Sequence, residues 1–543
     1  MRKLVQSSVI IIYEAVCEFW YCRHKALKRE KTKLHILIIT MYAISMDEEK
    51  KIFHFLKSRG CCLRCCLRFI GYRTSECYCK PFEFAARMDS FDTRDYISLE
   101  ETPCVVCLGV LQDKTQEKVV IKVIEEIEKK GYDCTTFTCA LTVPVSVKLR
   151  EQILYAHMSK ELDIHKSVID AIRTRLQNIK DTWKSFMIPK LEQAMKKYAD
   201  LLTPSPFLIE IFLAYANDEM IFKDLMNKHK EGNNKQKKRK FNDNIFSRKS
   251  IETLLLETTD EQLIQHFKIS QIVSKMFVSV DNILCSHSSI FIGGCYNKFS
   301  RKLSQTPWFI NGEKKVETSV QDLLCNLIAE TMKAESIKFL SSGREDVDVR
   351  NIYSGRPFAV ELINPRMTNI TNELLKHLAA NINLSTKQVQ ITSGLKVLSR
   401  FDLKKLKEGE NVKTKFYRAL CVCQSTNGDS LSQLETLNEL KNIKIIQKTP
   451  IRVLHRRPLS PRTRIIYEMR VRWAKPHELK KLQVPVENTD KFFILDVKTQ
   501  AGTYVKEFVH GDFGRTKPSL CEFLNAEVDI VALDVTGINL QWP

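Results

Sequence analysis

Two aspartates separated by one residue, Asp346 and Asp348, offer the clearest chemistry in this sequence. They lie in the segment 343–350, which reads GREDVDVR, and the segment 355–362 follows as GRPFAVEL. Residues two apart on a strand share one face, so repulsion would raise one carboxyl pKa unless a cation such as Arg344 or Arg350 compensates. A salt-bridged surface strand is the alternative. The apolar half of the second segment predicts a strand entering a core, so we expect the charged run in a loop at a strand edge, where active sites are often built.

Three further segments carry side chains that could act with these aspartates. The segment 413–420, KTKFYRAL, places Tyr417 between cations along a predicted strand. The segment 499–512, TQAGTYVKEFVHGD, passes through a glycine turn into a predicted helix with Lys506 in its first turn. A block rich in arginine spans 452–464. Each could be structural on its own, but together they describe a carboxylate, a stacking aromatic ring, a cation and a phosphate-binding patch.

The cysteines predict a metal site. Two Cys-x-x-Cys pairs, Cys62 with Cys65 and Cys104 with Cys107, could supply four thiolates at about 2.3 Å from a tetrahedral zinc ion. Their separation is longer than in a compact zinc ribbon, so a small subdomain must be inserted between them. A reduced, metal-free loop is the alternative, and nearby cysteines leave the choice of ligands open: Cys61, Cys66, Cys77 and Cys79. No histidine or carboxylate cluster accompanies the pairs, so we expect a structural metal.

Composition sets the class of partner. A chain of 543 residues predicts two or three domains. With 85 Lys and Arg against 64 Asp and Glu, its net charge of +21 favours a polyanion, with nucleic acid first. No apolar run reaches the roughly 20 residues of a membrane-spanning helix. The 18 cysteines, in a large chain without a signal peptide, favour a reduced compartment. No helix-turn-helix or finger spacing supports DNA binding.

Two segments look unlike the rest of the chain. Residues 1–45 mix apolar patches with basic runs and are expected to be an appended, disordered extension, with Met46 as an alternative start. A mitochondrial targeting segment is the other interpretation, and Glu14 and Glu18 count against it. The run 228–240, KHKEGNNKQKKRK, predicts a basic linker or insertion within 228–269 that continues into a connecting helix. A nuclear-import signal or a contact with an RNA backbone is its functional alternative.

Hydrophobic periodicity predicts an α+β chain. Apolar residues at steps of three and four from Ile169 to Phe186 predict one long helix that ends at Pro189, flanked by strands at 137–143 and 207–213. From about 270 onward the pattern is rich in strands, with a helix at 320–333. Strands are expected in five places: 276–280, 291–292, 358–363, 416–423 and 492–497. The second domain is therefore expected to be mixed α/β and to carry the aspartates.

Several of these segments resemble one known family. The segment 343–346, GRED, resembles the catalytic Arg-x-Asp motif of pseudouridine synthases. Together with GG at 293–294, SQTPW at 304–308 and QKTPIRVLHRRP at 447–458, it resembles the archaeal and eukaryotic family-ten tRNA pseudouridine synthases. The resemblance covers roughly 46–543, is strongest from 290 onward and includes the paired cysteines. It is weaker at 228–240 and at 470–490.

The resemblance implies a fold and a reaction. The fold would be a THUMP-type RNA-binding accessory domain with a zinc subdomain at 46–227, and a mixed α/β catalytic domain with a central antiparallel sheet at 270–543. The reaction would be isomerisation of uridine to pseudouridine at position 55, and also 54, of the tRNA T loop. It would need structural zinc and no organic cofactor.

The resemblance also assigns roles to residues. Asp346 would be the catalytic carboxylate with Arg344 beside it, Tyr417 would stack on the loosened base, and Lys506 would keep the aspartate ionised. Asp348 would brace the loop through Arg350 or backbone amides. Substrate would also be bound by a set of basic and aromatic residues: Arg344, Tyr504, Arg452, Arg456 and Arg457.

The implied partner is the T arm of tRNA, with other structured RNA as a further candidate, and the expected state is a monomer in the nucleus or cytoplasm, with mitochondria as the alternative. The rival hypothesis is a non-catalytic scaffold that presents tRNA or a primary microRNA transcript to other proteins. The presence of Asp346, Tyr417 and Lys506 together favours an enzyme, because a pure binder has no use for a buried carboxylate that faces RNA phosphates.

Overall fold

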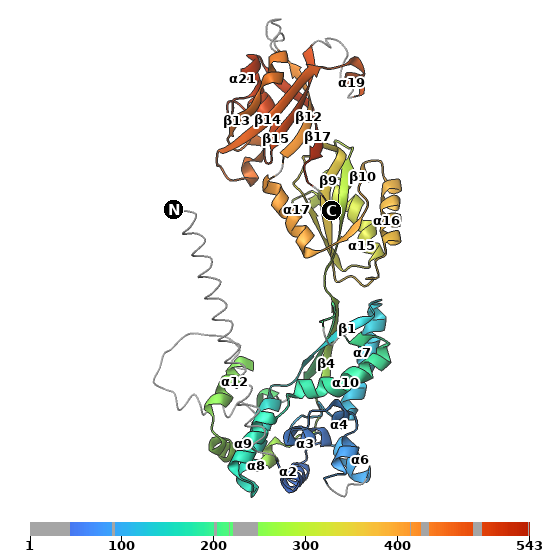
Figure 1. Cartoon of the computed structure of the whole chain (residues 1–543), viewed down its shortest axis with the longest axis vertical. Helices are drawn as coiled ribbons and strands as arrows, with labels where there is room; N and C mark the ends of the chain where they lie inside the picture. Colours follow the sequence, from blue (N-terminus) through green and yellow to red (C-terminus); the bar gives the residue numbers. More distant parts are fainter. Residues whose placement is uncertain are drawn as a thin grey trace, which may run out of the picture. The chain divides into compact units, whose positions relative to one another are not determined.

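The computed structural model describes residues 44–88, 93–199, 203–216, 218–220, 248–412, 414–424, 434–481, 491–540 and 542. It divides into two compact units (Figure 1). Unit 1 holds the described residues up to Lys130 together with Thr135–Cys285, and unit 2 holds Gly131–Cys134 with the described residues from Ser286 onward. The expected extension at 1–45 falls outside the described residues except for its last two, and the cationic run 228–240 falls outside them entirely. No described helix is long and apolar enough to cross a membrane.

Unit 1 is mainly helical around a four-stranded sheet. The strands run in the order β2 (Tyr198–Ala199), β1 (Thr136–Thr142), β3 (Phe207–Ala214) and β4 (Ser279–His287), and β1 is parallel to both β2 and β3. Its helices are α2 (Met46–Ser58), α3 (Leu63–Ile70), α4 (Ser75–Cys79), α5 (Pro81–Ala85), α6 (Thr93–Glu101), α7 (Asp113–Lys130), α8 (Ser146–Glu161), α9 (Lys166–Arg175), α10 (Ile179–Met195), α12 (Arg248–Glu257), α13 (Asp260–His266) and α14 (Ile269–Ile272).

The prediction of one long helix ending at Pro189 was wrong. The chain forms α9 and α10 instead, because Asn178 leaves the helical conformation and its side chain caps α10 by accepting from the Lys180 amide. Pro189 lies inside α10 and lacks the N–H that would donate to the Ser185 carbonyl. The hydroxyl of Ser75, in α4, donates to that carbonyl, so the helix continues past the proline.

Unit 2 contains an eleven-stranded sheet whose main path runs β10-β5-β9-β17-β12-β15-β14-β13-β16, with β11 paired to β5 and β8 paired to β9. The pairing is antiparallel along this path except between β9 and β17. The bounds are β5 (Ile290–Lys298), β8 (Ser336–Ser341), β9 (Arg350–Ile363), β10 (Val389–Ile391), β11 (Lys396–Leu398), β12 (Thr414–Cys423), β13 (Lys441–Gln447), β14 (Arg462–Trp473), β15 (Phe492–Gln500), β16 (Thr516–Lys517) and β17 (Val528–Ile538). The mixed α/β architecture expected here is confirmed, although β4 starts later than the strand expected at 276–280.

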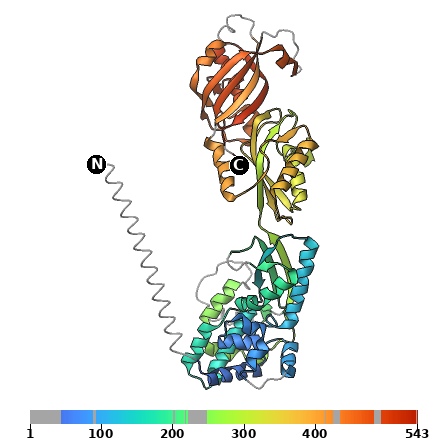
Figure 2. The same ribbon diagram turned by 45° about the vertical axis from the view of Figure 1, so that its right-hand side comes forward.

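Helices cover this sheet at two separate cores (Figure 2). The first core packs β5 and β9 against α15 (Val320–Thr331) and α16 (Asn372–Ser385). The second packs β12, β14, β15 and β17 against α20 (Val505–His510) and α21 (Leu520–Leu524). The remaining elements are the hairpin β6 (Phe309–Ile310) and β7 (Glu313–Lys314), α17 (Arg400–Val412), α19 (Pro476–Lys481), and the 3-10 helices η1 (Glu435–Glu439) and η2 (Ile451–Arg456).

The two halves of the sheet are joined along β9 and β17, which pair only at Arg350 with Asp534 and at Asn351 with Val535. The loop that carries the two aspartates leads directly into this junction, because it connects β8 to Arg350, the first residue of β9.

A candidate active site and a candidate metal site

Asp346 and Asp348 lie in a loop between β8 and β9, at a strand edge as expected. The loop is a turn and not a strand, so the two side chains do not share a strand face. Gly343 adopts φ 88°, and a Cβ there would lie 3.0 Å from Lys415 Nζ and 3.1 Å from Arg356 Nη1. Glycine is therefore required where the chain turns away from β8.

Each aspartate has its own cation. The Oδ2 atom of Asp346 lies 2.7 Å from Nη1 of Arg452 and 3.7 Å from Nζ of Lys506. The carboxylate of Asp348 accepts two hydrogen bonds from Lys506 Nζ, at 2.8 and 2.7 Å. Burial raises the pKa of Asp348, but the hydrogen bond and charge of Lys506 outweigh it and hold this pKa below its usual value. Lys506 therefore favours the charged form of Asp348.

The partners differ from those expected for the two flanking arginines. Arg344 is exposed and forms no ion pair with any residue that the structure describes. Arg350 binds Asp534 on β17, with Nε 2.9 Å from Oδ1, and leaves Asp348 to Lys506. The role of Arg350 is therefore to join the two halves of the sheet.

Arg452 is held by two carboxylates. Besides its contact with Asp346, its Nε lies 2.6 Å from Oε1 of Glu507, which is 2% exposed. Its guanidinium carbon also lies 6.0 Å from the centre of the Tyr504 ring. We expected Arg452 to bind phosphate, but the contacts make it a bridge inside the site. We did not predict the role of Glu507. Its position directly after Lys506, at the start of a predicted helix, could have indicated that it belongs to the site.

Helix α20 places Lys506 in its first turn, as predicted. Tyr504 is the N-cap residue of α20. The side chain of Gln447 holds its backbone: Oε1 accepts a hydrogen bond from the Tyr504 amide, and Nε2 donates one to the Tyr504 carbonyl, both at 2.9 Å. Lys506 is 17% exposed, and its ammonium lies 2.7 Å from Asp348 and 3.7 Å from Asp346.

Tyr417 lies on β12 between Val497 of β15 and Val535 of β17, and it packs against the second core. Burial raises the pKa of Tyr417 to about 12, with the charge of Arg356 opposing the rise and that of Asp346 adding to it. The side chain is therefore a neutral phenol, and it lies close enough to Asp346 for the two groups to interact electrostatically.

The residue between Arg344 and Asp346 points inward. Glu345 is buried, and its Oε2 lies 2.7 Å from Nε of Arg356, which is also buried. The Tyr296 hydroxyl donates to Glu345 Oε1 at 2.9 Å, and the Gln305 amide donates to Oε2 at 3.1 Å. This network anchors the buried side of the loop. Sequence alone could not predict that Glu345 would be the buried acidic residue.

The other arginines of the arginine-rich block 452–464 differ in exposure. Arg457 is exposed, and the side chain of Arg456 lies outside what the structure describes. Arg464 donates to the carbonyl of Thr463 and lies against Gly502. Of the three arginines expected to bind phosphate, Arg457 is thus the one whose described side chain is free to face an RNA backbone.

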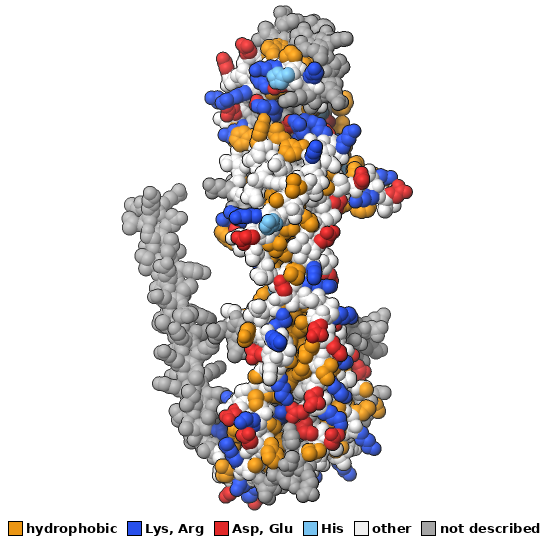
Figure 3. Space-filling model, turned by 90° about the vertical axis from the view of Figure 1, so that its right-hand side faces the viewer, with side chains coloured by type: hydrophobic (Ala, Val, Ile, Leu, Met, Phe, Trp, Pro, Cys, Tyr) orange, Lys and Arg blue, Asp and Glu red, His pale blue; other side chains and the backbone are white. Residues whose placement is uncertain are grey.

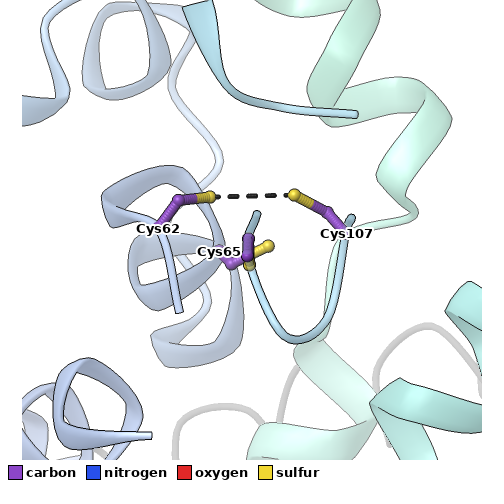
Figure 4. Close-up of side chains that lie close together, drawn as sticks. Cys62, Cys65 and Cys107 are labelled. Carbon is purple, nitrogen blue, oxygen red and sulfur yellow. Dashed lines mark hydrogen bonds between the residues drawn. The ribbon is translucent and has the colours of Figure 1, made fainter. Parts of the chain in front are cut away.

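The four predicted cysteine ligands come together in unit 1. The sulfur atoms of Cys62, Cys65, Cys104 and Cys107 all lie within 4.8 Å of one another and are buried. Cys62 and Cys65 come from the start of α3, and Figure 4 shows their side chains directed toward Cys107, with Cys62 Sγ 3.8 Å from Cys107 Sγ. A tetrahedron with metal–sulfur bonds of about 2.3 Å has edges of about 3.8 Å, so this donor set fits a four-coordinate metal.

Among the surrounding cysteines, Cys61 hydrogen-bonds to Cys104, whereas Cys79 and Cys66 have other surroundings. Cys79 is exposed, and Cys66 donates to the Cys61 carbonyl at 3.7 Å. Burial raises the pKa values of the Cys62 and Cys107 thiols, whereas hydrogen bonds from Cys107, Cys61 and Cys62 overcome burial and hold the pKa of Cys104 well below its usual value. One thiolate can be stabilised by hydrogen bonds alone, and four would require a cation.

Comparisons with known proteins identify the family of this chain. The family model described as eukaryotic Pus10, N-terminal, matches residues 104–285, and that described as Pus10, C-terminal, matches residues 291–539. The human tRNA pseudouridine synthase Pus10 is 35% identical over 453 residues, which cover 81% of this chain and 79% of that protein. The mouse protein of the same name is 32% identical over 92% of this chain and 98% of its own length.

The similarity to an archaeal relative and to a solved structure covers less of the chain. The tRNA pseudouridine synthase Pus10 of Thermofilum pendens is 37% identical over 251 residues, which cover 46% of this chain and 52% of that protein. A crystal structure of a Cbf5-Nop10-Gar1 complex aligns with 45% of this chain and 48% of its own at 15% identity with a TM-score of 0.24, which is too weak to support an argument. The family models and the two mammalian relatives, which span most of the chain, show that this protein belongs to the Pus10 family.

Proposed function

We propose that this protein is a tRNA pseudouridine synthase that converts uridine to pseudouridine in the T loop, at positions 55 and 54. The observation that carries the proposal is the Asp346 carboxylate, one-third exposed in the loop between β8 and β9 and held by Arg452 with Lys506 close by. The names of the mammalian and archaeal relatives support the same reaction.

The reaction needs a carboxylate but no second substrate. The bond from N1 of uracil to C1′ of the ribose breaks, the uracil turns, and a bond from C5 to C1′ forms. The proton on C5 is then lost and N1 carries a proton in the product, so atoms balance without an oxidant or cofactor. Asp346 would act at the sugar or the base, and it must be ionised to do so.

The cations make this ionisation possible. Two carboxylates this close in sequence repel each other unless nearby cations compensate. Arg452 and Lys506 divide the two charges between them, and Glu507 fixes Arg452 from the other side. Lys506 thereby acts on Asp346 mainly by neutralising Asp348.

Tyr417 would serve as the surface on which the loosened uracil turns. Its side chain is partly buried and packs against the second core, and we infer that the exposed part of the ring is the surface for stacking. The target base must leave its own stack to reach Asp346, and aromatic stacking is a sequence-tolerant way to hold it.

RNA would be held by charge. The net charge of +21 favours a polyanion, and Figure 3 shows Lys and Arg side chains on the surface of both units. Arg344 and Arg457 are exposed and would contact phosphates. Tyr504, held between Gln447 and Arg452, would support the site from its edge.

Unit 1 would be the accessory RNA-binding part. We infer that Cys62, Cys65, Cys104 and Cys107 hold zinc, because four thiolates in a tetrahedral arrangement suit this ion and leave no open position for catalysis. A THUMP-type fold for this unit remains part of the proposal.

Tritium release tests the function. A T-arm transcript labelled with tritium at C5 of uridine is incubated with the protein, and tritium in water reports the loss of the C5 proton. Transcripts with cytidine at position 54 or at position 55 assign the site. Release from both single variants supports the proposal, whereas tight binding without release would favour the scaffold hypothesis.

A further inference from the structure

Lys298, the last residue of β5, is a fully buried lysine directly behind the aspartate loop. Its Nζ donates to three backbone carbonyls: Leu303 at 2.8 Å, Asp346 at 3.0 Å and Val347 at 2.9 Å. An ammonium has three N–H donors, so all of them are used. Two of the three acceptors belong to the loop that carries the candidate catalytic carboxylate.

The next carbonyl of the loop is held from the same segment. Nη1 of Arg301 donates to the Asp348 carbonyl at 2.9 Å and to the Leu533 carbonyl at 2.8 Å, and Nη2 binds Asp534 at 2.6 Å. Three successive carbonyls, those of residues 346, 347 and 348, are therefore held by two cations that lie three residues apart. We call Lys298 and Arg301 the cationic cradle.

A buried lysine is costly, and its surroundings show why the charge is retained. Buried ammonium groups are rare unless they are paired. The charged groups that face Lys298 are Glu345, Asp346 and Asp348 from the loop and Arg356 from β9. Burial lowers the pKa of Lys298 to about 8; Glu345, Asp348 and Asp346 oppose this fall and Arg356 adds to it.

We propose that Lys298 is a positioning residue that fixes the backbone of Asp346 and directs its carboxylate at the substrate, and that only its protonated form does so. The inference rests on the proposed function. A neutral amine has two N–H donors and a lone pair, so one of the three carbonyls would lose its partner and face that lone pair. The loop would then loosen, and the rate of the chemical step would fall.

The direction of the expected pH dependence of the rate follows from the pKa of Lys298. Lys298 is protonated at pH values below about 8, so the rate is full there and falls as the pH rises through 8. The test measures single-turnover tritium release across about three pH units centred on 8. Four proteins are compared: wild type, Lys298→Arg, Lys298→Met and the control Lys302→Gln, which removes an exposed charge from the same segment.

The expected outcomes differ for each protein. The wild type and Lys302→Gln lose rate above pH 8. Lys298→Arg carries a charge that does not titrate below pH about 12, so its rate should not fall above pH 8. Lys298→Met has no donors, so its rate drops by roughly tenfold to a hundredfold at neutral pH and no longer varies across pH 8, with tRNA affinity within about twofold of wild type.

Results that overturn the role of Lys298 can be told apart from a result that refutes the proposed function. A fall in rate above pH 8 that persists in both Lys298 variants would arise from another group and would overturn the inference. If neither variant folds, the wild-type profile decides, because a flat profile through pH 8 overturns the inference and a fall there supports it. No tritium release from the wild type at any pH would instead refute the proposed function.

Discussion

Removing Arg452 should destabilise the protein as well as slow it. Arg452 bridges Asp346 at 2.7 Å and Glu507 at 2.6 Å, and among the described residues it is the cation that contacts Glu507. Breaking a buried ion pair costs about 3–5 kcal/mol, because one charge is left in the interior. Glu507 is 2% exposed but Arg452 is 36% exposed, so water can partly replace the guanidinium. We therefore expect Arg452→Gln to cost about 2 kcal/mol.

Thermal unfolding measures this cost. For a unit of this size, about 1 kcal/mol corresponds to about 2–4 °C in Tm, so Arg452→Gln should lower Tm by about 4–8 °C. The double variant Arg452→Gln/Glu507→Gln should recover part of the loss, since it no longer buries an unpaired charge. Arg470→Gln is the control, because Arg470 is 79% exposed in its pair with Glu468 and such surface pairs are worth about 0–1 kcal/mol.

The reasoning fails if Arg452→Gln unfolds within about 1 °C of wild type, or if its effect simply adds to that of Glu507→Gln. Such a result would mean that Arg452 is solvated in the free protein and available for phosphate, as its sequence context had suggested.

Three further outcomes follow from other parts of the structure. Elemental analysis should find about one zinc per chain and a lower content in Cys104→Ser, whereas unchanged zinc in that variant would rule out the four-cysteine site. Glu478 pairs with Arg472, which lowers the pKa of Glu478 to about 2, so its contribution to stability is present above pH 4.5 and is lost as the pH falls toward 2. The Tm difference between wild type and Glu478→Gln should therefore shrink over that range, and a constant difference would argue against the pair. Arg457→Gln should reduce the slope of log affinity for tRNA against log salt by roughly 0.7–0.9, and an unchanged slope would show that Arg457 contacts no phosphate.

Local patterns predicted the elements that carry the site. The glycine turn before Lys506 predicted the start of α20, alternation around Tyr417 predicted β12, and the spacing of the cysteines predicted the four that cluster. These features depend on residues close together in the sequence, so a single sequence is enough to read them.

Pairings between distant segments could not be predicted in this way. Asp346 and Arg452 are 106 residues apart, and nothing local distinguishes Arg452, which pairs with Asp346, from the exposed Arg457. The same holds for Pro189, because its tolerance inside α10 depends on a hydroxyl from Ser75, 110 residues before the carbonyl that it satisfies. Both features depend on long-range contacts.

The most direct test of the account compares Asp346→Asn with Asp348→Asn in single-turnover tritium release, with a binding isotherm for tRNA measured on each variant. Asparagine is nearly isosteric with aspartate but cannot act as a base or nucleophile. Because Arg452 aligns Asp346 whereas Lys506 neutralises Asp348, Asp346→Asn should abolish release while tRNA affinity stays the same or rises. Asp348→Asn should retain partial release or lose stability. Release that persists in Asp346→Asn and vanishes in Asp348→Asn would contradict the account and move the catalytic role to Asp348.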